Sequence, residues 1–206
     1  MNATISSIGV YHPKREVYNS FFEKSLDTSD EWIRERTGIE RRFFAAPNEF
    51  TSDMCVKAAE NLSANYNKDL ADVDFIIVAT TTPDQIVPSV ASQVQARLKI
   101  SHAGAIDISC ACAGFCNGLI LAKGLIASGS HKKVLVFGAD TLSKVTDFTD
   151  RTTCILFGDA AGAVIVEAST ENHLLNTITE TNGHYGKDLY LTSSKTHIND
   201  EEVIAN

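Results

Sequence analysis

The segment Asp107-Ile-Ser-Cys-Ala-Cys-Ala-Gly-Phe-Cys-Asn-Gly-Leu119 joins an apolar, strand-like run at 105–108 to a long helical pattern. Cys112 is therefore predicted to lie at a corner where a strand ends and a helix begins. The dipole and free N–H groups at a helix start favour a thiolate and can hold a developing oxyanion. Cys112 is thus a candidate nucleophile. The alternative is that Cys110, Cys112 and Cys116 are small core residues, because free cysteine is often buried.

The composition is that of a globular domain. The 206 residues, 44% of them hydrophobic, suffice for one domain or at most two small ones. No apolar run reaches the roughly 18 residues that span a bilayer, and residues 1–10 lack the pattern of a secretion signal. A net charge of -8 argues against nucleic acid as a partner, although local basic groups can bind a phosphorylated ligand. We predict a cytoplasmic location, without membrane or nucleic-acid partners.

The cysteine pattern also favours a reducing compartment. The five cysteines are an odd number, and three of them fall within seven positions, unlike the framework of a disulfide-stapled secreted domain. The spacing Cys110-x-Cys112-x3-Cys116 lacks a fourth ligand at the distance that zinc sites use. We therefore predict no metal site.

Strand-like and helical segments alternate along the chain. Strands are predicted at 3–11, 74–82, 105–108, 133–139, 160–168 and 173–181, and helices at 27–38, 51–65, 89–98 and 112–128. Apolar strands alternating with helices predict an α/β fold with a largely parallel sheet. The helix at 112–128 contains three glycines, each costing roughly 1 kcal/mol relative to alanine, which predicts a buried helix in close contact with neighbouring backbone.

The segment Asp27–Gly38 is predicted to form a short helix, which either binds a ligand or lies on the surface without one. Thr28 and Glu31 have the spacing of a capping box, and Trp32 and Arg36 fall one turn apart on one face. An aromatic plane beside a guanidinium can hold a base and a phosphate. The same two side chains can equally form a cation–π pair on a surface helix with no ligand.

Several segments together resemble β-ketoacyl-acyl carrier protein synthase III, a condensing enzyme of the thiolase fold. They are Asp27–Gly38, Ala79-Thr-Thr, Cys112-Ala-Gly-Phe115, Asp150-Arg151 and Phe157-Gly-Asp-Ala-Ala-Gly-Ala163, in the same order and at matching spacing. The resemblance covers nearly the whole chain. It implies an N-terminal, βαβαβ-type half of the α/β/α/β/α fold over 1–206, with its core at about 1–170 and the connection to a C-terminal half at 171–206.

The resemblance implies an acyltransferase that condenses acyl-CoA with malonyl-acyl carrier protein and loses carbon dioxide. The product, a 3-oxoacyl-acyl carrier protein, starts fatty-acid chains. Cys112 matches the nucleophile that takes the acyl group, because sulfur attacks thioesters readily and the acyl-cysteine stays activated. The resemblance also implies a homodimer and no cofactor, acyl-CoA being a substrate. Synthases of secondary metabolites and polyketide starters share these motifs and remain an alternative.

The resemblance assigns the remaining site residues to the two ends of acyl-CoA. Thr28, Trp32, Arg36 and Arg151 match the CoA contacts, with Trp32 and Arg151 on either side of the adenine and Arg36 near phosphate. Val87, Phe157 and Leu189 match the acyl pocket, and residue 87 reaches across the dimer interface in the family. Phenylalanine is familiar at that position, so Val87 is expected to admit a longer or branched starter.

Some residues implied by the resemblance have no counterpart here. The family uses a histidine and an asparagine beside the cysteine for decarboxylation, and both belong to the second half. His184 and His197 do not match that histidine and are predicted to be solvated loop residues. We therefore expect that the 206 residues alone do not condense the two substrates. A noncatalytic, thiolase-like partner subunit is the other hypothesis, and an acyl adduct on Cys112 would distinguish the two.

Overall fold

The computed structural model describes residues 2–171, 173–186, 188–192, 197–198 and 201–202. The chain divides into two units, residues 1–175 and residues 176–206, and each is considered by itself. The second unit contains a short 3-10 helix, η4 (Gly183–Tyr185), and a two-stranded sheet of β8 (His197–Ile198) and β9 (Glu201–Glu202). His184 is exposed, as predicted, whereas the side chain of His197 lies outside the described residues.

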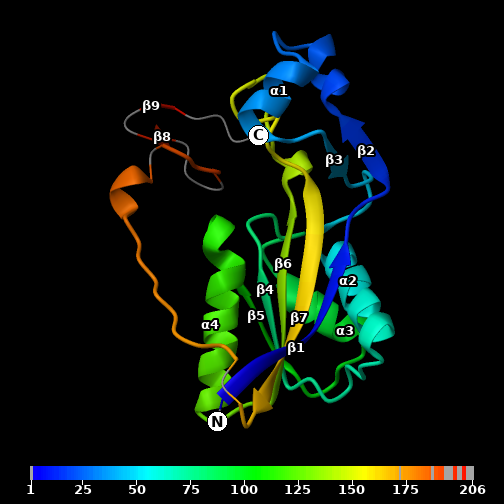
Figure 1. Ribbon diagram of the computed structural model, residues 1–206, viewed down its shortest axis with the longest axis vertical. Helices are drawn as coiled ribbons and strands as arrows, with labels where there is room; N and C mark the ends of the chain where they lie inside the picture. Colours follow the sequence, from blue (N-terminus) through cyan, green and yellow to red (C-terminus); the bar gives the residue numbers. More distant parts are fainter. Residues whose placement is uncertain (1, 172, 187, 193–196, 199–200, 203–206) are drawn as a thin grey trace. The chain divides into compact units, whose positions relative to one another are not determined.

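The first unit is built on a five-stranded sheet (Figure 1). Its strands, in spatial order, are β1 (Asn2–Tyr11), β7 (Asp159–Ser169), β6 (Lys133–Thr141), β4 (Phe75–Ala79) and β5 (Gly104–Ile108). β4 pairs in parallel with β5 and β6, while β7 pairs antiparallel with both β6 and β1. β1 therefore runs in the same direction as β4, β5 and β6, and the prediction of a mostly parallel sheet is confirmed.

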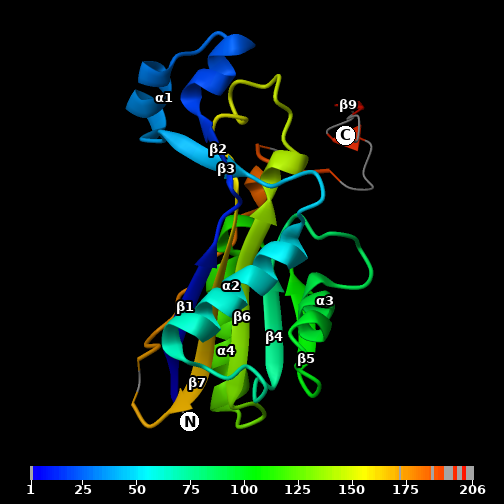
Figure 2. The same cartoon turned by 90° about the vertical axis from the view of Figure 1, so that its right-hand side faces the viewer.

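Helices cover both faces of this sheet (Figure 2). α2 (Thr51–Tyr66) and α3 (Val90–Arg97) lie on one face, and α4 (Gly114–Ala127) lies on the other. Successive strand residues point to opposite faces, so Ile76 and Val78 pack in the core beneath α2 and α3 while Ile77 packs beneath α4. The continuous apolar run in β4 is explained by this burial on both sides.

A smaller subdomain lies beyond the C-terminal ends of the parallel strands (Figure 1). It consists of β2 (Arg15–Tyr18), the 3-10 helix η1 (Asn19–Lys24), α1 (Asp30–Thr37) and β3 (Arg41–Phe44), with β2 and β3 paired antiparallel. Its core of Val17, Phe22, Ile33 and Phe44 is completed by Cys154 and Ile155. The segment between β6 and β7 is thereby packed against α1, which lies more than 100 positions earlier in the chain.

The glycines of α4 explain how closely this helix approaches the sheet. A Cβ atom on Gly118 would lie 2.9 Å from Val136 Cγ1, and one on Gly114 would lie 2.9 Å from Ala79 Cβ. Close packing is thus confirmed for these two glycines. Gly124, in contrast, has open space at its Cβ position, and Leu121 is 44% exposed. The prediction of a buried helix therefore holds for one face of α4 within the first unit.

Two local predictions are wrong. Ser29, and not Thr28, caps α1: its backbone is extended, and its Oγ accepts a hydrogen bond from the Trp32 N–H at 3.1 Å. The strand predicted at 173–181 is also absent, and those residues have irregular backbone. Leu174 donates a single backbone hydrogen bond to Ala3, and Ile178 is 90% exposed. Among the described residues no strand pairs with this segment, and an apolar pattern without a partner strand forms no sheet.

The glycine contacts predict opposite effects of two matched substitutions in α4. Gly118→Ala should lower the free energy of unfolding by about 1 kcal/mol or more, because the added methyl collides with the buried side chain of Val136. Gly124→Ala should raise it by up to about 1 kcal/mol, because alanine favours the helix and meets no neighbour. Urea unfolding followed by circular dichroism measures both. Equal stabilisation by the two variants would contradict the proposed packing.

Candidate functional site

The carboxyl ends of β4, β5 and β6 meet at one edge of the sheet because these strands are parallel. In open α/β sheets, ligands bind outside this edge. Cys112 follows β5, the subdomain of α1 lies at the same end, and the loop at 80–89 follows β4. The fold therefore gathers most of the predicted site residues of the first unit at one end of its sheet (Figure 1).

Cys112 lies at the predicted corner between strand and helix. It occupies a 3-10 turn, Ala111–Ala113, that leads into α4, and its side chain is exposed. Ala111 has φ 45°, a left-handed conformation that costs an L-residue roughly 1–2 kcal/mol. No side chain of the described residues caps the start of α4. The N–H groups of Ala113 and Gly114 instead donate to the backbone oxygens of Cys110 and Ala111 within the turn.

The other cysteines divide into two groups. Cys110 and Cys116 are exposed like Cys112, so the interpretation of all three as core residues is wrong for the first unit. Cys55 and Cys154 are buried, and burial raises the pKa of both thiols. Nearby carboxylates add to this rise, with Asp150 acting on Cys154. At neutral pH these two residues are protonated and shielded, which leaves the three exposed cysteines as candidate nucleophiles.

Trp32, Arg36 and Arg151 come together as predicted. The guanidinium carbon of Arg151 lies 4.8 Å from the centroid of the Trp32 ring, and that of Arg36 lies 5.4 Å from it. Arg151 also donates a hydrogen bond to the backbone oxygen of Asp27. Since Arg151 stands directly over the indole, a flat base can enter between them only if this side chain moves outward. Thr28 is close in sequence, and its Oγ1 is buried without a hydrogen-bond partner in the described part of the chain.

The turn that carries Arg151 is closed by its own side chains. Asp150 accepts hydrogen bonds from Thr152 Oγ1 at 2.6 Å, from the Thr152 N–H at 2.9 Å and from Thr153 Oγ1 at 2.6 Å. These hydrogen bonds lower the pKa of Asp150, and the bond from the Thr152 hydroxyl has the largest effect. The carboxylate form of Asp150 therefore holds the backbone around Arg151 in one conformation.

The predicted acyl-pocket residues fall in both units. Val87 is 80% exposed on the loop at 80–89, and Phe157 is half-buried after the Arg151 turn. Leu189 belongs to the second unit and is 69% exposed within it. In the first unit, an exposed apolar side chain at position 87 is available for contact with a further surface.

Two carboxylates that the sequence analysis missed hold the loop of Val87 at both ends. Asp140 Oδ1 accepts hydrogen bonds from the Thr81 N–H at 2.8 Å and from Thr82 Oγ1 at 3.1 Å. Asp107 accepts from the N–H groups of Val90 and Ala91, the first two residues of α3, at 2.7 and 2.8 Å. Two features of the sequence could have indicated this role: the threonines that follow the apolar run of β4, and the aspartate that interrupts the apolar run of β5.

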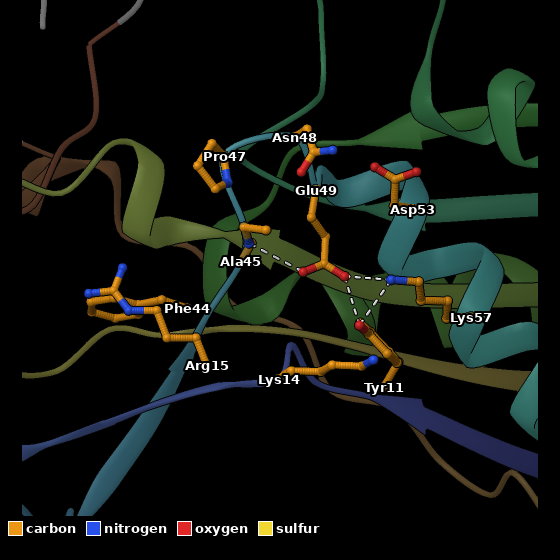
Figure 3. Close-up of a pocket in the computed structure, with 11 residues that line it drawn as sticks. Tyr11, Lys14, Arg15, Phe44, Ala45, Pro47, Asn48, Glu49, Asp53 and Lys57 are labelled. Atoms are coloured by element: carbon orange, nitrogen blue, oxygen red, sulfur yellow. Dashed lines mark hydrogen bonds and ion pairs between the residues drawn. The ribbon is translucent and has the colours of Figure 1, made fainter.

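A groove of about 510 Å³ lies where β1 meets the start of α2 (Figure 3). Inside it, Glu49 Oε1 accepts hydrogen bonds from Tyr11 Oη at 2.7 Å and from Lys57 Nζ at 2.5 Å. Burial disfavours the charged form of Glu49, but the hydrogen bonds from Lys57 and Tyr11 outweigh it, and the net pKa is lowered. The three groups satisfy one another, and this arrangement ties β1 to α2.

Neither a metal centre nor a membrane-spanning helix is found where the structure is described. No three histidine, cysteine, aspartate or glutamate side chains converge there on a possible ion position. Likewise, no helix among those residues has the length and apolarity needed to cross a bilayer.

Comparison with known proteins gives consistent matches. The family model described as 3-Oxoacyl-[acyl-carrier-protein (ACP)] synthase III matches residues 106–183. The chain is 52% identical over 203 residues to Beta-ketoacyl-[acyl-carrier-protein] synthase III 2 of Halalkalibacterium halodurans, covering 98% of this chain and 61% of that protein. The protein of the same name from Bacillus subtilis is 49% identical, with coverages of 98% and 62%. The chain thus spans about 60% of the length of these relatives.

Solved structures agree with the sequence matches. The structure of Beta-Keroacyl-[Acyl Carrier Protein] Synthase III from Thermus thermophilus has a TM-score of 0.87 and 39% identity, covering 98% of this chain and 63% of that one. The 3-oxoacyl-[acyl-carrier-protein] synthase III of Aquifex aeolicus has a TM-score of 0.79 and 46% identity, with coverages of 82% and 55%. A priming β-ketosynthase of the R1128 polyketide pathway has a TM-score of 0.80 and 35% identity, with coverages of 83% and 51%.

The burial of the cysteines predicts which thiols react in the folded protein. A maleimide should label Cys110, Cys112 and Cys116 in the native state, whereas Cys55 and Cys154 should react only after unfolding in urea. Peptide mass mapping after a short exposure identifies the labelled residues, and the unfolded sample is the control for complete labelling. Native labelling of Cys55 as fast as that of Cys112 would contradict the described core.

Proposed function

We propose that this chain, whose resemblance to β-ketoacyl-[acyl-carrier-protein] synthase III is confirmed over 98% of its length, forms the acyl-cysteine part of such an enzyme. The reaction is the decarboxylating condensation of acyl-CoA with malonyl-acyl carrier protein, which starts fatty-acid chains. The observation that carries the proposal is the exposed thiol of Cys112 on a strained turn at the uncapped start of α4.

In the first step, the Cys112 thiolate attacks the carbonyl carbon of the acyl thioester. The negative charge that develops on the carbonyl oxygen would be stabilised by the backbone N–H of Cys112 itself and by the dipole of α4. The new carbon–sulfur bond to Cys112 forms, the bond to the CoA sulfur breaks, and CoA leaves as its thiolate. The acyl group then remains activated as a thioester on the enzyme. Decarboxylation of the malonyl thioester needs further electrophilic groups, which the family resemblance places in a second half of the enzyme.

Trp32, Arg36 and Arg151 are proposed to bind the nucleotide end of CoA, together with Thr28. The indole offers a flat apolar face for adenine, and the two guanidiniums beside it can pair with phosphates. Arg151 would swing outward to stack on the far side of the base. The cation–π contact between Arg151 and Trp32 keeps the site ordered when no ligand is bound. On binding, this contact would be exchanged for contacts with the ligand.

Val87, Phe157 and Leu189 are proposed to line the acyl pocket. A valine leaves more space than the phenylalanine familiar in the family, so a longer or branched starter would fit. Ile86 and Val87 are 85% and 80% exposed in the first unit, and this exposure supports a homodimer in which the loop at 80–89 reaches a second copy.

The proposal also includes a cytoplasmic location and no requirement for a cofactor. All five cysteines are free thiols, which suits a reducing compartment. A starter synthase for polyketides is a second candidate, favoured by the 35% identity to the priming β-ketosynthase. Both candidates use the same acyl transfer to Cys112 and differ in the acceptor and the starter.

The first prediction from this proposal is a single acyl adduct on Cys112. The protein incubated with an acyl-CoA should gain the mass of one acyl group, and peptide mapping should place it on Cys112. Cys112→Ser should abolish the adduct, because a neutral hydroxyl needs a general base to attack a thioester. Cys110→Ser and Cys116→Ser are matched controls that should keep it, since both are exposed neighbours without a proposed role. An adduct on Cys110, or none at all, would refute the assignment.

The second prediction concerns the nucleotide end. Arg36→Ala and Arg151→Ala should raise KM for acyl-CoA more than they lower kcat, because they contact a part of the substrate remote from the reacting carbon. The effect should shrink as salt is added, as expected for exposed charges. Arg34→Ala is the control: this arginine lies on the same helix but pairs with Asp30 and Glu40. Equal losses with an acyl thioester that lacks the nucleotide would contradict the assignment.

A further inference from the structure

Arg42 of β3 is a buried cation, 5% exposed, that has no carboxylate partner among the described residues. Its guanidinium lies over the ring of Phe22 at 4.6 Å, and its Nε atom has no hydrogen-bond partner there. Burial lowers the pKa of Arg42. A buried charge held by neutral groups is a poor way to stabilise a core, and an apolar residue of similar volume often does better. The arrangement therefore calls for another explanation.

The hydrogen bonds of Arg42 reach two segments that are far apart in the sequence. Nη2 donates to Asn19 Oδ1 and to the backbone oxygen of Ile155, both at 2.9 Å. Nη1 donates to the backbone oxygen of Val17 at 3.3 Å. One rigid, planar group thus joins η1 and β2 to the segment between β6 and β7.

Asn19, which accepts one of these hydrogen bonds, itself donates hydrogen bonds at both ends of α1. Its Nδ2 donates to Asp30 Oδ1 at 2.8 Å, at the first residue of the helix, and to the backbone oxygen of Ile39 at 2.7 Å, just after the helix ends. Trp32 lies on this helix. Ile155 is at the other end of the connection, four residues after Arg151, and a backbone hydrogen bond from Cys154 to Asp150 closes the turn between them.

We infer that Arg42 is a positioning residue that sets the separation between Trp32 and Arg151 and thereby controls how the nucleotide of acyl-CoA is held. The inference rests on the proposed function of those two residues. A guanidinium suits the task because its donors lie in one plane at fixed angles, so it orients three carbonyl groups at once. Lysine keeps the charge but cannot reproduce this fork.

The experiment compares Arg42→Lys and Arg42→Gln with the matched control Arg41→Lys in the intact protein. Arg41 is the neighbouring residue on β3, is exposed, and pairs with Glu16. Transfer of the acyl group to Cys112 is measured with acyl-CoA and with the same acyl group on pantetheine, which lacks the nucleotide. Trp32 is the single tryptophan of the chain, so its fluorescence on titration with CoA reports the site directly.

Both Arg42 variants should raise KM for acyl-CoA on the order of tenfold, leave KM for acyl-pantetheine unchanged, and weaken the response of Trp32 to CoA. Arg41→Lys should behave like the unsubstituted protein. Equal rises in KM for the two substrates, or a fall in kcat alone, would show a merely structural role and overturn the inference, as would variants with normal CoA binding. Should a variant fail to fold, the other one and the fluorescence titration decide. If the unsubstituted protein shows no response of Trp32 to CoA, the proposed nucleotide site fails and the inference fails with it.

Discussion

The close approach of α4 to the sheet is the constraint on which the candidate site depends. Gly114 and Gly118 let the helix lie against Ala79 of β4 and Val136 of β6, at distances that a side chain would prevent. The short connection from β5 must then turn sharply to reach the helix, and Ala111 takes up the left-handed conformation that this turn demands. Cys112 follows immediately, two residues before Gly114, so its exposure at the helix start follows from the close packing of the first two turns of α4.

The carboxylates at the same edge of the sheet accept hydrogen bonds from backbone N–H groups of the neighbouring loops. Asp107 and Asp140 hold the loop at 80–89, and Asp159 accepts hydrogen bonds from Ala45 and Ser143 N–H groups at 2.6 and 2.8 Å. These carboxylates therefore hold the loops at this edge of the sheet in place.

Much of the fold could be predicted because β4 and β6 are apolar runs buried on both faces and the helices have periodic apolar positions. The strand order could not, since it depends on pairing between distant segments, and the residues at 173–181 show that an apolar pattern without a partner strand forms no sheet. In the candidate site, the motifs predicted a grouping of Trp32, Arg36 and Arg151, and these three side chains lie together. Arg42 was missed because an arginine in a short strand suggests an exposed position, although alternation with the buried Phe44 on the same side of β3 was a signal.

The small core beneath α1 explains why directional bonds are needed there. It contains Val17, Phe22, Ile33 and Phe44 from the subdomain but only Cys154 and Ile155 from the segment that carries Arg151. Apolar contact is non-directional. A core of so few side chains can therefore hold the two segments together without fixing the distance between them. Hydrogen bonds from one planar group do fix it, because each loses strength when its angle changes. A buried guanidinium is therefore costly for stability but well suited to fixing geometry, as the proposed binding of a base between Trp32 and Arg151 requires.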